Sequence, residues 1–483
     1  MQVDIVRHAR LTALAAAAFS MLVLGGCMSF IPAYERPAAP VAPAYSPELT
    51  PAGAPGSVPA ADIEWQRFFA DPRLKRLIEL SLQNNRDLRV AILNIEQARA
   101  SYQIRRADEL PSIGAGVNAQ RQAAGSGGLV NIWAVGLQVT SYELDFFGRV
   151  RSLSQAALAQ YLATEEARKT TQISLVASVA TTYIGLLADD ESLRVTRETL
   201  TTREDSFRLT KLRFDNGASS EVDVRQAEQL LETAKASLAQ TQRQRALDEN
   251  ALTLLVGQAL PVDLPAPLPL GAQQVPLDLP AGLPSELLAR RPDVRSAERQ
   301  LLAANANIGA ARAAFFPRIS LTTTLGTAST ELSSLFKGGT FALTGTAQLL
   351  QPIFDAGRNR ANLDVAKVNR DIAVAQYEKS IQTSFREVSD ALAGRATLGE
   401  QLRAQLAQTQ ALAVTYRLAD LRYRAGAASY LDALDAQRSL FVAQQALVQT
   451  QALQLQNLVA LYRVLGGGWK EGAAVLNAEA TSR

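Results

Sequence analysis

One turn between two helices occurs twice in this chain, first as LRFDNGASSEVDVRQAE (residues 212–228) and again as LRYRAGAASYLDALDAQ (residues 421–437). In each copy a helical segment ends at a glycine, Gly217 or Gly426, which is the residue that most readily makes such a turn. In the later copy Ser429 is placed to cap the second helix, which carries Asp432 and Asp435. The repetition predicts two helical hairpins of one design.

The repeat extends far beyond the turn. Gly217 and Gly426 lie 426 − 217 = 209 positions apart, and upstream Pro111 and Pro317 lie 317 − 111 = 206 apart. The 209 offset also joins Gly148 to Gly357, Arg149 to Arg358, Gly185 to Gly394, Asp223 to Asp432 and Gly257 to Gly466, and the 206 offset joins Asp87 to Asp293, Arg89 to Arg295 and Ile113 to Ile319. Constant offsets predict two structural copies that differ by three residues between Pro111 and Gly148.

Each copy has the same order of elements: a helix that stops before a proline, two strands, and a long helical hairpin. We expect the first copy over residues 62–257, with a strand pair at 112–146 and its hairpin tip near 217. The second copy covers 285–466, with a strand pair at 318–351 and its tip near 426. The proline-rich segment 258–284 is expected to be an extended connector, and residues 467–483 a C-terminal tail.

The strand pairs alternate between apolar and small polar residues. In the first copy we expect strands at 112–122 and 132–144; in the second, the alternating runs begin at Ile319 and at Phe341. Such alternation indicates half-buried strands, and about ten residues is the length of a tilted membrane strand. The apolar side is expected to hold Trp133, Val135, Leu137, Val139, Ile319, Leu321, Leu325, Phe341, Leu343 and Leu349. Trp133 and Phe341 are either interfacial anchors of a barrel or ordinary sheet-packing aromatics.

The hairpin segments are expected to form coiled coils. Between Gly148 and Gly217 the chain has no proline and only one glycine, Gly185, so one long helix is expected there. The returning helix of the second copy repeats large apolar residues every seven positions, namely Leu434, Phe441, Val448, Leu455 and Tyr462. A second seven-spaced row, Gln437, Gln444 and Gln451, fits either a solvated outer face or a water-lined interior.

Composition excludes several classes of function. The net charge is +3, and removal of residues 1–26 with Asp4, Arg7 and Arg10 leaves +2, so nothing indicates a nucleic-acid partner. The one histidine is His8 and the one cysteine is Cys27. A chain that begins at Cys27 therefore lacks serine–histidine catalysis, histidine-bound metal and disulfides.

The N-terminus has the layout of a targeting segment. Arg7 and Arg10 precede an apolar run from Leu11 to Leu24, and Gly25-Gly26-Cys27 follows. This ending resembles the bacterial lipobox, which implies cleavage before Cys27 and a covalent lipid, N-palmitoyl and S-diacylglycerol, on that residue. The alternative is an ordinary signal peptide with an incidental cysteine. Residues 27–61, rich in proline and alanine, are expected to be an extended tether.

Four membrane strands cannot close a barrel alone. Open strand edges are not tolerated in lipid, and small barrels start at about eight strands. Several chains must therefore contribute strands to one barrel, with the coiled coils continuing as a tube.

The sequence resembles the TolC-like outer-membrane efflux factors, in particular the lipid-anchored branch that serves resistance–nodulation–division pumps. The resemblance covers about residues 62–470 and is carried by LDFFGR (144–149), ARRPDV (289–294) with AE (297–298), AARAAFFP (310–317), PIFDAGR (352–358) and YLDALDAQR (430–438). It implies a mixed α/β, mainly α fold: a homotrimeric 12-stranded outer-membrane β-barrel, four strands per chain, continued by a periplasmic α-helical barrel with an equatorial domain.

The same resemblance implies a passive gated duct without cofactor, catalytic residue or metal. Its expected partners are a periplasmic adaptor protein, an inner-membrane resistance–nodulation–division transporter and outer-membrane lipid. Gly148, Arg149, Gly357 and Arg358 mark the expected strand-to-helix junctions. The exported substrate is left open because the pump selects it, and a type I protein-secretion duct is the alternative within the family.

The hairpin tips are expected to form the periplasmic aperture. Asp432 and Asp435 share one helix face and match aspartates that ring the aperture in the family, although carboxylates near a helix N-terminus are also favoured by the helix dipole. Tyr423 and Asp223 match a pair that holds the gate shut; their alternative roles are a core tyrosine and a helix-start aspartate. Ala428 stands where the family often has an arginine, and Arg422, Arg424 and Arg225 are the candidates to replace it.

Two readings from other functional classes compete with a duct. A carboxylate-pair hydrolase using Asp432 and Asp435 has no aromatic-lined pocket signal nearby. A structural coiled-coil lipoprotein that spaces two membranes leaves the two pairs of alternating strands unexplained.

Overall fold

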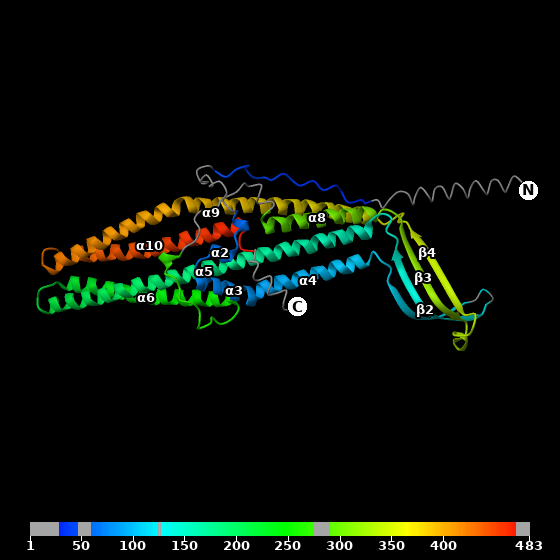
Figure 1. The fold of residues 1–483 in the computed structure, drawn as a ribbon, viewed down its shortest axis with the longest axis horizontal. Coiled ribbons are helices and arrows are strands. Elements are labelled where there is room, and N and C mark those ends of the chain that lie inside the picture. The colour runs from blue at the N-terminus through cyan, green and yellow to red at the C-terminus, as the bar shows by residue number, and fades with distance from the viewer. Residues whose placement is uncertain (1–28, 47–58, 124, 126, 274–289, 470–483) are drawn as a thin grey trace, which may run out of the picture. The chain divides into compact units, whose positions relative to one another are not determined.

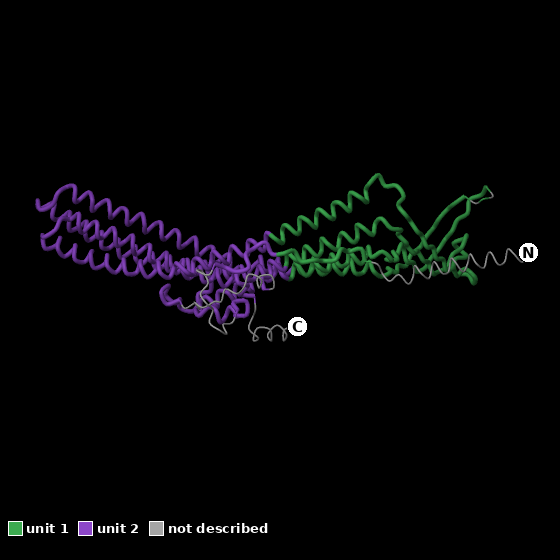
Figure 2. Tube along the Cα trace, turned by 90° about the horizontal axis from the view of Figure 1, so that it is seen from above, with its two compact units in different colours: residues 1–38, 94–165, 296–378 green, residues 39–93, 166–295, 379–483 purple. Residues whose placement is uncertain are grey.

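The computed structural model describes residues 29–46, 59–123, 125, 127–273 and 290–469. The leader, Cys27, part of the tether, residues 274–284 of the connector and residues 470–483 of the tail lie outside the described residues. The chain divides into two compact units (Figure 2). Unit 1 consists of Met1–Ala38, Asn94–Glu165 and Ser296–Glu378, and unit 2 consists of Ala39–Leu93, Glu166–Arg295 and Lys379–Arg483.

Unit 1 contains a four-stranded antiparallel sheet in the order β1-β2-β3-β4 (Figure 1). The strands are β1 (Ile113–Ala123), β2 (Leu129–Glu143), β3 (Arg318–Ser329) and β4 (Phe341–Leu350). The central pair, β2 and β3, joins one strand from each copy of the repeat. Among the described residues, β1 and β4 each have a single strand neighbour, so both edges of the sheet are open.

The register places the expected apolar residues on one face. Val135 lies opposite Val117 and Thr327, and Leu325 lies opposite Leu137 and Leu343. Opposed residues of antiparallel strands share a face, so the apolar residues of all four strands lie together. The alternation in the sequence is thereby confirmed. The other face carries small and polar residues, among them Asn118, Gln138, Thr324, Thr344 and Gln348.

Strand β2 contains a bulge near its C-terminal end. The β2–β3 register shifts between Val139 and Tyr142, and Ser141 has a φ of 53°. One extra residue in β2 bends the strand and leaves Tyr142 opposite Leu321, on the apolar face. The second copy has no such shift between β3 and β4.

The long helices of the two copies match in length. Both α5 (Arg149–Asp215) and α9 (Arg358–Arg424) have 67 residues, and they turn back into α6 (Glu221–Val256) and α10 (Tyr430–Val464) (Figure 1). The helices before the strands are α4 (Arg86–Ala107) and α8 (Pro292–Ala313), and both stop before a proline as expected. Because each copy builds the same elements in the same order, the internal repeat is structural as well as sequential.

Unit 2 has a core that the repeat pattern did not indicate. The short helix α2 (Trp65–Phe68) packs against the end of α10, and α3 (Pro72–Asn84) packs against α6. Phe68 stacks on Tyr462 with 3.9 Å between ring centroids, and the hydroxyl of Tyr462 donates to the Ile63 carbonyl at 2.6 Å. Asp71 caps α3 and also accepts a hydrogen bond from Tyr183 of α5 at 2.9 Å. Residues 60–84 are thus anchored on the long helices.

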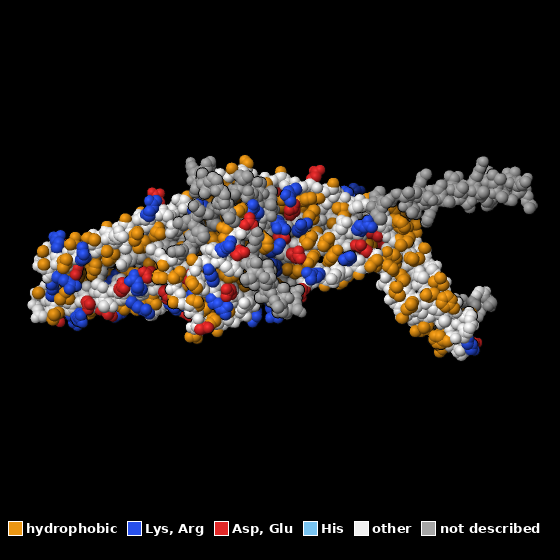
Figure 3. All heavy atoms as spheres, viewed as in Figure 1, with side chains coloured by type: hydrophobic (Ala, Val, Ile, Leu, Met, Phe, Trp, Pro, Cys, Tyr) orange, Lys and Arg blue, Asp and Glu red, His pale blue; other side chains and the backbone are white. Residues whose placement is uncertain are grey.

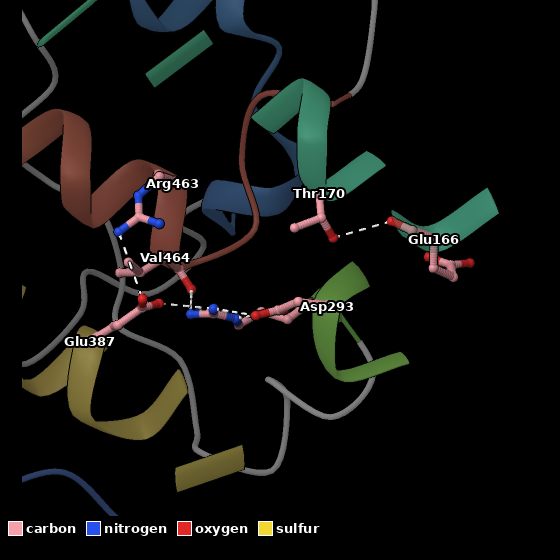
Figure 4. A network of polar contacts seen from close by, with 7 residues as sticks. Glu166, Thr170, Asp293, Glu387, Arg463 and Val464 are labelled. Carbon is pink, nitrogen blue, oxygen red and sulfur yellow. Dashed lines mark hydrogen bonds and ion pairs between the residues drawn. The ribbon is translucent and has the colours of Figure 1, made fainter. Parts of the chain in front are cut away.

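A buried arginine joins three helices in unit 2. The Arg291 guanidinium forms ion pairs with Asp293 at 2.5 Å and Glu387 at 2.9 Å, and donates to the Val464 carbonyl at 3.0 Å. Figure 4 shows Asp293, Glu387 and Val464 converging from α8, α9 and α10. Both carboxylates offset the cost of burying the guanidinium, so this contact fixes the start of α8 against the second hairpin.

The heptad row of α10 is largely confirmed as core: Leu434, Val448, Leu455 and Tyr462 are buried. The glutamine row lies inward too, since Gln437 is buried and Gln444 and Gln451 are half-buried. Within the described residues α5 is the one helix apolar enough to span a membrane by length and composition, and 61% of its apolar window is buried in the fold.

The connector contains one short helical turn, η3 (Leu270–Ala272), whose Leu270 joins the core of unit 2. The remaining described connector residues, up to 273, have no helix or strand. That the connector is extended stays a prediction, because residues 274–284 lie outside the described residues.

Candidate functional site

Both hairpin tips fold in the same way. Gly217 and Gly426 each have a φ of 72°, a conformation that L side chains rarely adopt. The amide of Ala218 donates to the Arg213 carbonyl at 2.8 Å, and the amide of Ala427 donates to the Arg422 carbonyl at 2.8 Å. These bonds satisfy the last carbonyls of α5 and α9. The two turns are therefore local structures encoded by each glycine.

A serine caps the returning helix at each tip. The Ser220 hydroxyl accepts from the Asp223 amide at 3.2 Å, and the Ser429 hydroxyl accepts from the Asp432 amide at 3.3 Å. The cap expected at Ser429 is confirmed. In the first hairpin the Asp223 side chain completes a capping box.

Asp223 lies within its own turn. Its carboxylate accepts from the Ser219 hydroxyl at 3.0 Å and the Ser220 amide at 3.1 Å. Partial burial raises its pKa, but the hydrogen bonds from Ser220 and Ser219 outweigh burial and hold the pKa below the usual range. Within the described part of the chain no hydrogen bond joins Asp223 to Tyr423.

Tyr423 is buried among residues of both hairpins. Its ring lies 5.2 Å from that of Tyr430, and the Arg213 guanidinium of the first hairpin lies 4.5 Å from its centroid. The cluster also contains Ala227 and Leu230 of α6 and Ala433 and Leu434 of α10. Tyr423 is thus part of the core that holds the two tips together within one chain.

Asp432 and Asp435 lie on the exposed face of α10. The neighbouring positions Ala433, Leu434 and Ala436 are buried and form the opposite face. Neither carboxylate takes part in an ion pair among the described residues. The pair is thus available to form a charged surface, and it is not enclosed in a pocket.

The arginines near the two tips have different partners. Arg424 pairs with Asp420 at 2.8 Å, Arg225 pairs with Glu228 at 2.9 Å, and Arg422 is exposed. The arginine that contacts Tyr423 is Arg213. It is the repeat equivalent of Arg422 at the 209 offset, which is the signal that could have identified it.

A cavity of about 530 Å³ lies beside the tip cluster in unit 2. Tyr416, Tyr423 and Tyr430 contribute aromatic walls, while Asp205 and Asp420 contribute charge. Further from the tip along α5, Arg203 is only 3% exposed. Its guanidinium donates to the Leu230 carbonyl at 2.9 Å and lies 5.1 Å from the Phe441 ring centroid. Burial and then the charge of Arg438 lower the pKa of Arg203.

The sheet of unit 1 exposes its apolar face. Val117 is 74% exposed, Leu343 67% and Phe341 70%. Figure 3 shows hydrophobic side chains gathered on the strands, whereas charged side chains are frequent over the helices. Trp133 is half-buried. A broad exposed apolar face of this kind is suited to lipid rather than water.

The two strand-to-helix junctions differ. Gly148 and Gly357 have φ values of 70° and 85° before α5 and α9. Arg149 pairs with the buried carboxylate of Glu143 at 2.7 Å, and Arg318 of β3 pairs with the same carboxylate at 2.6 Å. At the second junction Asp355 accepts from the amides of Gly357 and Asn359 at 3.0 and 2.9 Å. Glu143 therefore joins the two copies, and its equivalent at the 209 offset is Pro352.

Within the described residues no group of three or more histidine, cysteine, aspartate or glutamate side chains is placed to hold a metal ion. The geometry of the site is that of an exposed charged surface beside a packed cluster at the hairpin tips.

The sequence matches the family described as outer membrane efflux protein twice, over residues 77–258 and residues 283–467. The chain belongs to this family. The two matches coincide with the two copies of the repeat. Among relatives, this efflux protein is 49% identical over 477 residues to the probable efflux pump outer membrane protein TtgC of Pseudomonas putida, covering 96% of the chain and 97% of that protein. It is 44% identical to the outer membrane protein OprJ of Pseudomonas aeruginosa, covering 94% and 96%.

Solved structures agree with this family assignment. The open state of the Neisseria gonorrhoeae MtrE outer membrane channel has a TM-score of 0.84 and 42% identity, covering 92% of the efflux protein and 99% of MtrE. CusC has a TM-score of 0.80 and 38% identity, covering 91% and 100%. The resemblance to TolC-like channels and the mainly α fold with a four-stranded sheet are confirmed. The efflux protein is an outer-membrane efflux channel with a large periplasmic portion, and the family's role is that of a duct.

Proposed function

We propose that three copies of this efflux protein close one 12-stranded barrel in the outer membrane and that their helical hairpins continue it as a gated periplasmic duct. The open four-stranded sheet carries this proposal. Its apolar face is exposed and both of its edges lack a strand neighbour among the described residues. Lipid accepts the apolar face but not the open edges, so sister chains must supply the missing strands.

The hairpin tips form the periplasmic aperture in this proposal. Three chains place six tips around one axis, and the exposed pair Asp432 and Asp435 then repeats as a ring of negative charge. Asp223 and Tyr423 belong to the latch between hairpins: Tyr423 holds tips within a chain, while Asp223 fixes its own turn. Opening of the duct requires the tips to separate.

The duct is passive and receives its cargo from partners. Relatives are named as toluene, solvent and antibiotic efflux pump proteins of Pseudomonas putida. By this likeness the efflux protein exports small apolar molecules and drugs, handed over by a periplasmic adaptor and an inner-membrane resistance–nodulation–division transporter. We assign it no enzymatic activity and no cofactor.

Cys27 is the proposed site of N-palmitoyl and S-diacylglycerol attachment. The segment that follows it is held on unit 1. Phe30 stacks on Phe316 at 4.6 Å, and Arg312 donates to the Phe30 carbonyl at 3.2 Å. Further along, Arg36 pairs with Glu298 at 2.8 Å. These contacts direct the N-terminal end of the described chain to the strand-to-helix junction, where an acyl anchor reaches the membrane.

Reconstitution into planar bilayers tests the duct. The purified acylated protein should form an SDS-resistant trimer and conduct ions, whereas a membrane-spacing lipoprotein conducts nothing. A soluble single-chain species without conductance overturns the proposal. Capture of the adaptor and pump with the tagged protein separates drug efflux from a type I secretion duct, and mass spectrometry of wild type beside Cys27→Ser tests the lipid.

A further inference from the structure

We propose that β4 of one chain pairs with β1 of a second copy in one defined register, in which Leu349 lies opposite Val117, Gln348 opposite Asn118 and Ala347 opposite Ala119. This inference rests on the proposed closure of the barrel by sister chains. It adds which residues lie opposite each other at each seam, which is the line where two paired strands meet. The internal repeat carries the argument, because one chain already contains a copy of that seam.

The first step is the equivalence of the two hairpins. Ile113 and Ile319 are repeat equivalents at the 206 offset. In the structure Ile113 lies opposite Val139, and Ile319 lies opposite Leu349. Val139 and Leu349 are therefore equivalent positions, with 349 − 139 = 210 residues between them.

The bulge explains the extra residue. The offset between equivalent residues of the two copies is 209 near Gly148 and Gly357. Over the part of β2 that precedes the bulge, up to Val139, it is 210. The β2–β3 register shifts by one between Val139 and Tyr142, with Ser141 at a φ of 53°. A one-residue bulge in β2 that β4 lacks accounts for the difference. The equivalence also pairs like with like, since Gln138 corresponds to Gln348 and Val139 to Leu349.

The second step applies the register of the β2–β3 pair to the pair of β4 with β1 of a second copy. Within one chain β2 pairs with β3; β4 is the equivalent of β2, and β1 is the equivalent of β3. The pair Val139–Thr323 therefore becomes Leu349–Val117, Gln138–Thr324 becomes Gln348–Asn118, and Leu137–Leu325 becomes Ala347–Ala119. In a closed barrel every seam contributes to one total stagger, so equivalent seams are expected to share their register.

Side chains fit this register. Leu349 and Val117 both lie on the apolar face, and Gln348 and Asn118 both lie on the polar face. A slip of one residue would oppose residues of different faces and is excluded. Arg121 falls opposite Gly345, which leaves room for its long side chain. A slip of two residues would retain the faces and lose these matches.

One feature of the central seam is not repeated. A Cβ on Gly136 or on Gly326 would collide with the backbone of the partner strand, so these two glycines allow a close crossing. Their equivalents are Thr346 and Gln120. At Thr346 and Gln120 the two strands of neighbouring chains must therefore have ordinary spacing. For this reason the test pairs are placed nearer the strand-to-helix junction.

Double-cysteine cross-linking in outer membranes tests the register. The pairs are Leu349→Cys with Val117→Cys and Gln348→Cys with Asn118→Cys. Two successive pairs are used because opposed residues of antiparallel strands alternate between hydrogen-bonded and non-hydrogen-bonded pairs. Oxidation should link the full-length acylated chains into a ladder that ends at the trimer. The shifted controls are Leu349→Cys with Ala119→Cys and Leu349→Cys with Ala115→Cys. Each displaces the cysteines by about 7 Å along the strand, so cross-linking on the order of ten-fold weaker is expected.

The outcomes separate the register from the proposed function. An intrachain pair, Val139→Cys with Thr323→Cys, reports that the strands are formed and oxidisable. Stronger cross-linking of a shifted pair overturns the register, and retained bilayer conductance of those variants leaves the duct intact. Failure of every interchain pair while the intrachain pair reacts overturns the seam, and loss of trimer and conductance in the wild type overturns the proposed function itself.

Discussion

The guanidinium of Arg213 lies 4.5 Å from the centroid of the Tyr423 ring and joins the tip of the first hairpin to the second within one chain. A cation–π contact at such a half-exposed site contributes about 0.5–2 kcal/mol. Through this contact a charged side chain of the first hairpin reaches Tyr423, the tyrosine expected to latch the gate.

Arg213→Ala should raise the conductance of the reconstituted channel. Loss of the contact lets the two tips separate at lower cost, and sensitivity to large antibiotics should rise in parallel. Single-channel recording measures the effect. Arg208→Ala is the matched control, because Arg208 is highly exposed and pairs only with Asp205 among the described residues. Equal conductance of Arg213→Ala and wild type would show that this contact does not restrain the aperture.

Tyr423→Phe and Asp223→Ala should together raise conductance and admit large antibiotics normally kept out. No hydrogen bond joins the two side chains among the described residues of one chain, so in the proposed latch the two residues meet across hairpins of neighbouring chains. A double-mutant cycle on conductance tests this. A coupling of about 0.5–3 kcal/mol is expected for residues in one network, and strictly additive effects or wild-type conductance would contradict the latch.

Asp223→Ala should also destabilise the start of α6 by about 0.5–1.5 kcal/mol, the usual net contribution of a hydrogen bond, because the capping box loses the bond from the Ser220 amide. The carboxylate has a lowered pKa in the folded protein, so its contribution is present above the unfolded value of about 3.9 and is lost as the pH falls through the folded pKa. Thermal unfolding at pH 7 and pH 3 measures this. The difference between variant and wild type should shrink at acid pH, and an equal difference at both pH values would refute the assignment.

Asp189 of α5 is expected to make the first hairpin less stable as the pH rises. Burial, then the charge of the hydrogen-bonded Asp248 on α6, raises the pKa of Asp189 to about 7. Its Oδ2 atom is buried without a hydrogen-bond partner among the described residues, and a proton shared with Asp248 would satisfy it. An acid whose pKa is raised on folding loses its contribution as the pH climbs from about 4, the unfolded value, towards the folded one.

Asp189→Asn should therefore gain stability relative to wild type between pH 4 and pH 7, by about 1–2 kcal/mol after solvent screening is allowed for. Above pH 7 the gain should level off. Asp190→Asn is the control, since Asp190 pairs with Arg245 at 2.6 Å and its loss should not stabilise the protein. A pH-independent difference between Asp189→Asn and wild type would exclude the shared proton.

Glu143→Gln should weaken the junction between the two copies. The Glu143 carboxylate is 9% exposed and pairs with Arg149 and Arg318, so its removal leaves two arginines without their partner. Because Arg149 and Arg318 are 33% and 55% exposed and water can solvate them, the expected cost is about 1.5–3 kcal/mol, the usual value for hydrogen bonds to a charged group. The temperature at which the SDS-resistant oligomer dissociates measures the loss. Glu331→Gln on an exposed loop is the control, and an unchanged dissociation temperature for Glu143→Gln would show that the triad is dispensable.

Sequence alone determined the parts that depend on neighbouring residues. The glycines at 217 and 426 define the tips because few other residues adopt a φ of 72°. Alternation defined the strands and their apolar face, and the absence of proline defined α5 and α9. The constant offsets then made the two copies predictable as a pair.

Only the tertiary structure decided the contacts between distant segments. The pairing of β2 with β3, the bulge at Ser141, the Glu143 triad and the Arg213–Tyr423 contact join residues that are remote in sequence or depend on strand register. The core made by α2 and α3 was not indicated by the repeat, because it depends on contacts between segments far apart in the sequence, such as that of Phe68 with Tyr462. Local propensity and periodicity are properties of a short stretch, whereas these contacts arise from how the two copies pack on each other, which no single stretch encodes.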